Sequence, residues 1–418
     1  MSSFKGKIAV AAKRERQDNF DAWLNRNVTF RRKIPINDEL RPAVEHLYSL
    51  LGFTGYKKDQ KLDDLHILIE NLLANRTKRP VAIPMSPNQW SALAPRYAPF
   101  ATRNTIQLIN VMQEKGMLGV AKGYQGSKCN RLTRIWPTDY LLEYFPKTER
   151  QYSSKYRLGE LVELKDDEGN LIDYKDNERT IRIRNILKKA NEVSAKHDIL
   201  CRDYRVSAFL YAIFKNKITC YGRLHTRGNR HYQGFSGNER QEFTINGQRV
   251  VELDFSGLQP RLLYALEGIQ FNDDPYSIVC SSQKARPFLK NILLSLLNAR
   301  SFQKGEAAAN KWLREHTAER QALSEIGISK ARPLMDAFYE AHKPIAHHFC
   351  NADTTGLKLM SLDAKIALDI VHYFSKRNIA ILAIHDSFIV QEQYGKELEG
   401  VMEAVYAKHT KGFEPVIK

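Results

Sequence analysis

The run RVVELDFSGLQPRLLYALE at residues 249–267 constrains the fold of this chain most. Its first part, RVVELDF, is a β-branched apolar run that is typical of a buried strand. Its second part has apolar residues at helical spacing, with Pro260 in the first turn. Asp254 therefore lies at the carboxyl end of a buried strand, directly before a helix. An acid in this position either caps the helix or binds a metal.

A second acid follows a related pattern near the end of the sequence. Residues 379–391 read IAILAIHDSFIVQ, in which two short apolar strands flank His385-Asp386-Ser387 and predict a hairpin. Alone, Asp386 would be interpreted as a turn residue that bonds its own backbone. Together with Asp254, it predicts two carboxylates on adjacent strand ends. Such a pair can hold two Mg²⁺ ions for phosphoryl transfer.

Between these acids, KARPFLKNILLSLLNAR at residues 284–300 predicts an amphipathic helix. Six apolar residues form its expected inner face: Phe288, Leu289, Ile292, Leu293, Leu296 and Leu297. Another stripe, at intervals of four, contains Arg286, Lys290, Leu294 and Asn298. The two cations of that stripe suit a triphosphate and its pyrophosphate leaving group. A solvated basic face is the alternative.

Composition indicates a polyanionic partner. The 418 residues include 64 Lys and Arg against 47 Asp and Glu, which gives a net charge of +17. Most of the excess falls in the first third of the chain, as expected if that part binds nucleic acid; a basic surface without a partner is the alternative. With 43% hydrophobic residues, a disordered basic chain is excluded.

The cysteines and the apolar segments indicate the cellular compartment in which we expect the protein. The five cysteines include no CxxC pair, so neither a disulfide framework nor a cysteine zinc site is expected, and a reducing interior fits them. Neither a signal peptide nor a run of 18 apolar residues is present, so no membrane partner is expected. We therefore expect a cytoplasmic protein.

The first 150 residues contain two kinds of pattern. Residues 38–54 and 59–76 have helical periodicity, and a basic, proline-bearing linker follows them. Residues 86–140 then predict a short helix at 86–95, a longer one at 102–116, and two strands around a basic turn. That order resembles a winged helix-turn-helix domain. The resemblance places Arg103, Asn104, Gln107 and Asn110 on the outer face of the recognition helix, and Lys128, Arg131 and Arg134 on the wing against phosphates. A packing module is the alternative.

The two halves are joined by residues 151–204. Residues 156–176 predict a β-hairpin with a turn near Glu168-Gly169-Asn170, and residues 179–197 predict a strongly basic helix.

Several motifs in the second half share the order found in one enzyme family. Asp254-Phe255-Ser256, Arg286-x-x-x-Lys290 and His385-Asp386 resemble motifs A, B and C of the family A DNA polymerases and the related single-subunit RNA polymerases. Gly222-Arg223-Leu224, the RQEF segment before NGQRVVELDFS, and FYEAHKPIAHHF at 338–349 resemble further segments of that family. The resemblance covers roughly residues 205–395.

The resemblance implies a role for each matching residue. Asp254 and Asp386 would bind two Mg²⁺ ions, or Mn²⁺ in their place, with the backbone carbonyl of Phe255 as a further ligand. The remaining roles concern the nucleotide and the primer. Arg286 and Lys290 would hold the triphosphate, Gln259 would lie beneath the sugar, Leu294 and Asn298 would occupy the other motif B positions, and Arg223 and His385 would lie near the primer end.

The implied fold is an α+β right hand. We expect a palm over 205–418 with a fingers insertion at about 275–340, and a reduced thumb or connector at 151–204. A helical region at 1–80 and a winged-helix-like nucleic-acid-binding domain at 81–150 would precede it. The long thumb of the family has no obvious counterpart.

The expected function is template-dependent nucleotidyl transfer, most simply by a DNA polymerase without proofreading, from a phage or mobile element and acting in DNA replication. Primed DNA and nucleoside triphosphates would be its partners. The family motif B ends in Tyr-Gly, where this chain has Asn298-Ala299, and Gln259 replaces a glutamate. These departures, and the HDSF sequence, leave a primase or single-subunit RNA polymerase as the alternative. A catalytically inactive winged-helix DNA-binding protein is the third reading.

Overall fold

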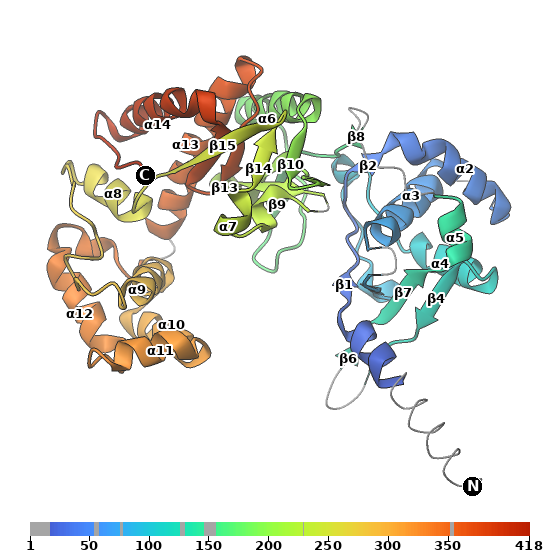
Figure 1. Cartoon of the computed structure of the whole chain (residues 1–418), viewed down its shortest axis with the longest axis horizontal. Coiled ribbons are helices and arrows are strands. Elements are labelled where there is room, and N and C mark those ends of the chain that lie inside the picture. Colours follow the sequence, from blue (N-terminus) through green and yellow to red (C-terminus); the bar gives the residue numbers. More distant parts are fainter. Residues whose placement is uncertain are drawn as a thin grey trace, which may run out of the picture. The chain divides into compact units, whose positions relative to one another are not determined.

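The computed structural model describes residues 17–53, 58–75, 78–125, 130–145, 156–228, 230–351 and 355–418. The chain forms two compact units (Figure 1). The N-terminal unit comprises Met1–Glu160 and Arg227–Arg230, and the C-terminal unit comprises Leu161–Thr226 and His231–Lys418. None of the helices in these described ranges combines the length and apolar character needed to span a bilayer.

The N-terminal unit is built on a four-stranded sheet in the order β1-β3-β7-β4. Its strands are β1 (Val28–Thr29), β3 (Val81–Ile83), β4 (Leu118–Ala121) and β7 (Thr133–Pro137); two further pairs join β2 (Ile36–Asn37) to β8 (Tyr156–Arg157) and β5 (Tyr124–Gln125) to β6 (Asn130–Arg131). Its helices include α2 (Arg41–Leu50), α3 (Lys58–Asn75), α4 (Asn104–Glu114) and α5 (Asp139–Glu143). The helices predicted at 38–54, 59–76 and 102–116 are therefore confirmed.

The helix predicted at 86–95 is wrong. Only two single 3-10 turns form there, Pro87–Gln89 and Pro95–Tyr97. The chain leaves the first turn at Trp90, whose side chain is buried and whose indole N–H donates to the Pro84 carbonyl over 3.1 Å. Anchoring of this ring, with a proline opening each turn, prevents a continuous helix.

The C-terminal unit holds a six-stranded sheet in the order β11-β10-β14-β15-β17-β16 and a three-stranded sheet in the order β13-β12-β9. The strands are β9 (Val162–Lys165), β10 (Ile199–Cys201), β11 (Tyr204–Arg205), β12 (Phe209–Lys215), β13 (Lys217–Arg227), β14 (Phe243–Ile245), β15 (Gln248–Asp254), β16 (Leu382–Ile384) and β17 (Ser387–Gln391). The helices are α6 (Glu178–Lys196), α7 (Gly237–Arg240), α8 (Leu258–Leu266), α9 (Arg286–Asn298), α10 (Phe302–Glu315), α11 (Thr317–Ser324), α12 (Arg332–Ala341), α13 (Leu357–Lys376) and α14 (Gly395–Thr410).

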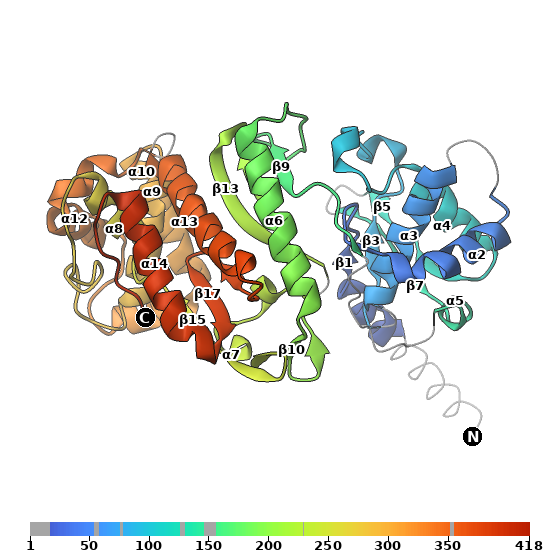
Figure 2. The same ribbon diagram turned by 90° about the horizontal axis from the view of Figure 1, so that it is seen from above.

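The helices of this unit form two groups. α6, α13 and α14 lie side by side, and α14 also contacts β15 and β17 (Figure 2). The second group, α9 to α12, lies apart from the sheet and is reached through α8 (Figure 1). The basic helix predicted at 179–197 is thus α6. The hairpin predicted at 156–176 is reduced to one bridge, Lys165 with Leu171, because β9 pairs with β12 instead.

Gly119 offers a test of the N-terminal unit. A Cβ at this position would lie 2.1 Å from Cε2 of Trp136, and the Trp136 ring is fixed by Trp23, whose ring centroid is 5.2 Å away. We expect Gly119→Ala to lower the free energy of unfolding by about 1–3 kcal/mol, measured by chemical denaturation. The control is Gly400→Ala on exposed α14, where no atom lies within 4 Å of the new methyl group. It should stabilise by about 0.4–1 kcal/mol, and equal effects of the two changes would contradict the packing.

Candidate active site

Two aspartates meet where β15 ends beside the β16–β17 hairpin. In the antiparallel ladder of β15 with β17, Asp254 lies opposite Ser387, the residue after Asp386. The Phe255 N–H donates to the Asp386 carbonyl over 3.1 Å. Because the C=O of a residue in an extended strand lies on the same side as its N–H, the Phe255 carbonyl faces the hairpin turn. The structure thus brings together Asp254, Asp386 and the Phe255 carbonyl, the three groups for which the family resemblance implies metal binding.

The hairpin turn has two residues. Ile384 pairs with Ser387, so His385 and Asp386 form the tip. His385 has a φ of 57°, in the left-handed region that few residues other than glycine adopt. The predicted hairpin is confirmed, and its tip exposes His385 while Asp386 remains half-buried.

Negative charge accumulates at this strand end. Partial burial raises the pKa of Asp254 to about 7, and the charges of Asp386 and Glu252 add to the rise. Lys290 and Lys418 oppose the effect, so their ammonium groups are within electrostatic reach. The site therefore holds closely spaced carboxylates that the local cations only partly neutralise.

The third carboxylate, Glu252, is already engaged. Arg240 contacts it through two hydrogen bonds of 2.8 and 3.0 Å, and the Ser387 hydroxyl donates to it over 2.7 Å. Glu252 lies two residues before Asp254 on β15, on the same face of the strand. We infer that Glu252 orients Ser387 at the hairpin, a role that the sequence did not indicate.

Arg223 on β13 is held by an acid that sequence reasoning missed. Its guanidinium forms hydrogen bonds of 2.8 and 3.1 Å with the buried Asp363 of α13. Burial raises the pKa of Asp363, against the charge of Arg223, and the charge of Asp386 raises it further. Burial also lowers the pKa of His225 to about 4, with smaller effects from His385 and Arg223 among its neighbours. Arg223 and His385 thus belong to one cluster beside Asp386.

The amphipathic pattern of α9 is confirmed, because all six predicted inner residues are buried. Arg286, however, forms a bidentate ion pair with Asp274, with distances of 2.8 and 2.7 Å. Its guanidinium also lies 5.0 Å from the centroid of the Tyr276 ring. Arg286 holds the pKa of Asp274 well below its usual range, while burial raises the pKa of Tyr276 to about 12. The helical pattern of α9 could not have shown that Arg286 has a protein partner, because Asp274 lies outside that helix.

The rest of the predicted stripe faces outward. Lys290, Leu294 and Asn298 are exposed, and the Asn298 amide donates to the Leu294 carbonyl over 2.8 Å. Gln259 is half-buried in the first turn of α8, which begins after Gly257 with a φ of 63°. α8 thus starts at Leu258, four residues after Asp254, and the helix that the sequence predicted directly after this acid is confirmed.

The nucleic-acid residues predicted on α4 have different surroundings. Arg103, Gln107 and Asn110 are exposed. Asn104 is half-buried, and its side chain forms a hydrogen bond with Asp64 of α3. Asp64 is buried and also accepts from the Thr102 N–H over 2.6 Å, so it fixes the start of α4.

The predicted wing residues also differ from one another. Arg131 on β6 is exposed, and its guanidinium lies 6.0 Å from the centroid of the Tyr124 ring. Arg134 is not at the surface: only 7% of it is exposed, and it belongs to β7, an inner strand of the sheet between β3 and β4. The prediction that Arg134 lies on the wing surface, against phosphates, is therefore wrong, because its side chain is buried. Lys128 lies outside the described residues.

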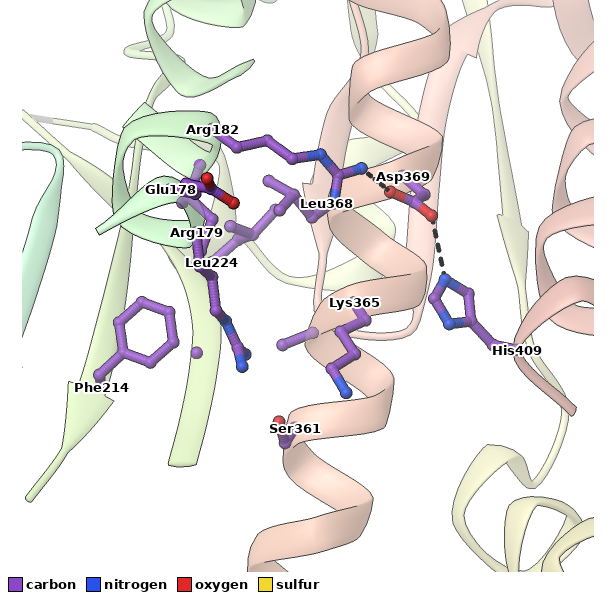
Figure 3. A pocket seen from close by; sticks show the side chains of 13 residues that line it. Glu178, Arg179, Arg182, Phe214, Leu224, Ser361, Lys365, Leu368, Asp369 and His409 are labelled. Carbon is purple, nitrogen blue, oxygen red and sulfur yellow. Dashed lines mark hydrogen bonds and ion pairs between the residues drawn. The ribbon is translucent and has the colours of Figure 1, made fainter. Parts of the chain in front are cut away.

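A pocket of about 400 Å³ lies elsewhere in the C-terminal unit, between α6 and α13 (Figure 3). Asp369 binds both Arg182, over 2.9 Å, and His409, over 3.0 Å, at one side of it. Arg179 and Lys365 also line it, but none of the predicted site residues does. The pocket is thus distinct from the carboxylate site.

Comparisons with known proteins give little further information. No protein family matches the sequence, and no curated protein is detectably related. Among solved structures, the chain is similar to the POL domain of Pol1 from M. smegmatis, in a complex with DNA primer-template and dNTP, with 12% sequence identity and a TM-score of 0.28. The alignment covers 92% of this chain and 66% of that domain. A TM-score this low does not establish a common fold.

The crowded carboxylates predict an effect on stability. Because the pKa of folded Asp254 is raised, its ionised form destabilises the fold above about pH 7, and this penalty fades as the pH falls toward 4. Without divalent ions at pH 8, Asp254→Asn should raise the free energy of unfolding by about 1–2 kcal/mol. Mg²⁺ should raise the melting temperature of the wild type more than that of the variant. An equal response of both proteins to Mg²⁺, measured by calorimetry, would contradict a metal-binding role for Asp254.

Proposed function

We propose that the chain is a template-directed nucleotidyltransferase that extends the 3′ end of a primer strand. In its finer form, the proposal is a DNA polymerase of family A type without proofreading. The observation that carries it is the register of β15 with the β16–β17 hairpin, which brings Asp254 beside Asp386. Two carboxylates at adjacent strand ends are the arrangement that phosphoryl transfer with two metals requires.

The donor set fits magnesium. Asp254, Asp386 and the Phe255 carbonyl offer only oxygen, which Mg²⁺ prefers, and the cluster carries more negative charge than its neighbours neutralise. When bound there, Mg²⁺ would stabilise the attacking and the leaving oxygen of the phosphoryl group. The protein's part is to keep both carboxylates in place on strands that pair along five positions.

Cations on α9 serve the triphosphate. Lys290 is exposed and lies within electrostatic reach of Asp254, so its ammonium can neutralise charge on phosphates that lie against the carboxylate site. Arg286 must exchange the carboxylate of Asp274 for phosphate oxygens if it is to share this role. Until then, its ion pair fixes the start of α9 and so positions Lys290 one turn away.

Each unit separately offers groups that suit contact with nucleic acid. Arg223 is oriented by Asp363 and lies near His385 and Asp386, which suits contact with the primer end. Arg103, Gln107 and Arg131 are exposed on the N-terminal unit and suit contacts with phosphates. The basic composition of the chain supports this assignment.

Primer extension tests the proposal. Purified wild type should extend a primed template with dNTPs in the presence of Mg²⁺. Asp254→Asn and Asp386→Asn should each lower the rate by at least roughly 10³-fold, because each removes a charge that holds the metal while affinity for primed DNA is retained. Asp203→Asn, in the turn between β10 and β11, is the matched control and should leave the rate unchanged. Synthesis by either site variant at the wild-type rate would exclude the assignment.

Gln259 tests which sugar is accepted. It is similar in size to glutamate but offers an amide donor, so it can exclude a 2′-OH by bulk or bind it by a hydrogen bond. Asn298 is smaller than tyrosine and lies along α9, which opens the space beside the sugar. We expect dNTP use with weakened exclusion of NTPs, and a rise in NTP incorporation for Gln259→Ala. Competition assays, in which each dNTP is mixed with the NTP of the same base, measure the ratio of dNTP to NTP incorporation.

The opposite result has a definite meaning. If the wild type prefers NTPs and Gln259→Ala reduces their use, then Gln259 recognises the hydroxyl, and the protein is a primase or RNA polymerase. The HDSF sequence at the hairpin favours this second candidate.

A further inference from the structure

Two adjacent histidines and a glutamate converge at the carboxyl end of α8. The Nε2 atom of His348 lies 2.7 Å from Oε1 of Glu267, and the Nε2 atom of His347 lies 3.3 Å from the same oxygen. One ligand atom from each of the three residues lies within 4.8 Å of the other two. We propose that Glu267, His347 and His348 form a binding site for a transition-metal ion, with Zn²⁺ as the best fit.

The spacing suits a tetrahedral ion. With metal–ligand bonds of about 2.0–2.1 Å, neighbouring ligand atoms of a tetrahedral zinc site lie roughly 3.3 Å apart. The His347–Glu267 distance already has this value, and the His348–Glu267 distance requires a small lengthening. The two imidazole rings have centroids 4.1 Å apart and planes at 37°, and the Nε2 atoms of both rings lie near the same oxygen of Glu267.

The donor set distinguishes this site from the carboxylate pair. Two imidazole nitrogens and one carboxylate oxygen favour Zn²⁺, Ni²⁺ or Co²⁺ over Mg²⁺, which prefers oxygen. The remaining position is open to solvent, because 59% of the His347 side chain and 33% of the Glu267 side chain are exposed. His348 is the least exposed of the three, at 20%, and Thr355 lies 3.4 Å from its Nδ1. A contact to the second ring nitrogen fixes the orientation of a metal-binding histidine.

The proposed metal site lies where two elements of the C-terminal unit meet. Glu267 ends α8, the helix that starts beside Asp254, and the two histidines lie in the 3-10 segment Lys343–His348 after α12. A polar link already joins these elements nearby, because Tyr264 and His342 form a hydrogen bond of 3.1 Å. A bound ion would strengthen the existing contact of Glu267 with His347 and His348, which already joins α8 to the segment after α12.

Metal titration of the full chain tests the proposal. Co²⁺ should give the visible absorption of a tetrahedral site, and Zn²⁺ should abolish it by displacement. Glu267→Gln, His347→Ala and His348→Ala should each lower the affinity for Zn²⁺ by at least tenfold, since loss of a mere hydrogen-bond partner of a ligand typically costs about 10–100-fold. His46→Ala, an exposed histidine on α2, is the control and should bind Zn²⁺ as the wild type does.

Two further measurements separate this site from the carboxylate pair. Excess Mg²⁺ should not displace Co²⁺, and the Asp254→Asn, Asp386→Asn double variant should bind Zn²⁺ unchanged. If that double variant alone lost Zn²⁺ binding, the ion would belong to the carboxylates and the proposal would be wrong. If no variant at Glu267, His347 or His348 altered Zn²⁺ affinity, the three side chains would only contact one another without binding a metal, and the proposal would likewise fail.

Discussion

The antiparallel pairing of β15 with β17 is the constraint on which the rest of the candidate site depends. It brings together two acids from distant parts of the sequence, and a register shift of one residue would turn one acid to the opposite face. Apolar residues along the two paired strands fix that register. Leu253, for example, lies opposite Phe388, whose side chain is buried. Burial of these apolar side chains thus offsets the repulsion between the two nearby carboxylates.

That proximity organises the surrounding polar groups. Within the part of the chain that the structure describes, Asp254 and Asp386 form no ion pair with a lysine or arginine, whereas Glu252 is bound by Arg240 and Asp363 is bound by Arg223. Arg240 and Arg223 therefore neutralise Glu252 and Asp363, and the carboxylates of Asp254 and Asp386 stay available to a divalent ion. The site thus contains two kinds of carboxylate: those that have an arginine partner and those that do not.

Local patterns predicted the strands and helices of the candidate site, but they could not show which residues distant in the sequence become partners. The strand ending at Asp254, the hairpin around Asp386 and the buried face of α9 follow from periodicity alone. The ion pair of Arg286 with Asp274 does not, because the linking loop has no periodic signal. Arg134 was misplaced for a related reason: a basic residue beside a turn looks exposed until the sheet order makes its strand central.

Anomalous scattering from Mn²⁺ tests the central claim most directly. Crystals of the chain with primed DNA, a non-hydrolysable dNTP and Mn²⁺ would be measured near the manganese edge. We predict anomalous peaks between the carboxylates of Asp254 and Asp386, in contact with the Phe255 carbonyl and the nucleotide phosphates. Clear density for the nucleotide at this site without any peak between the two carboxylates would contradict the account.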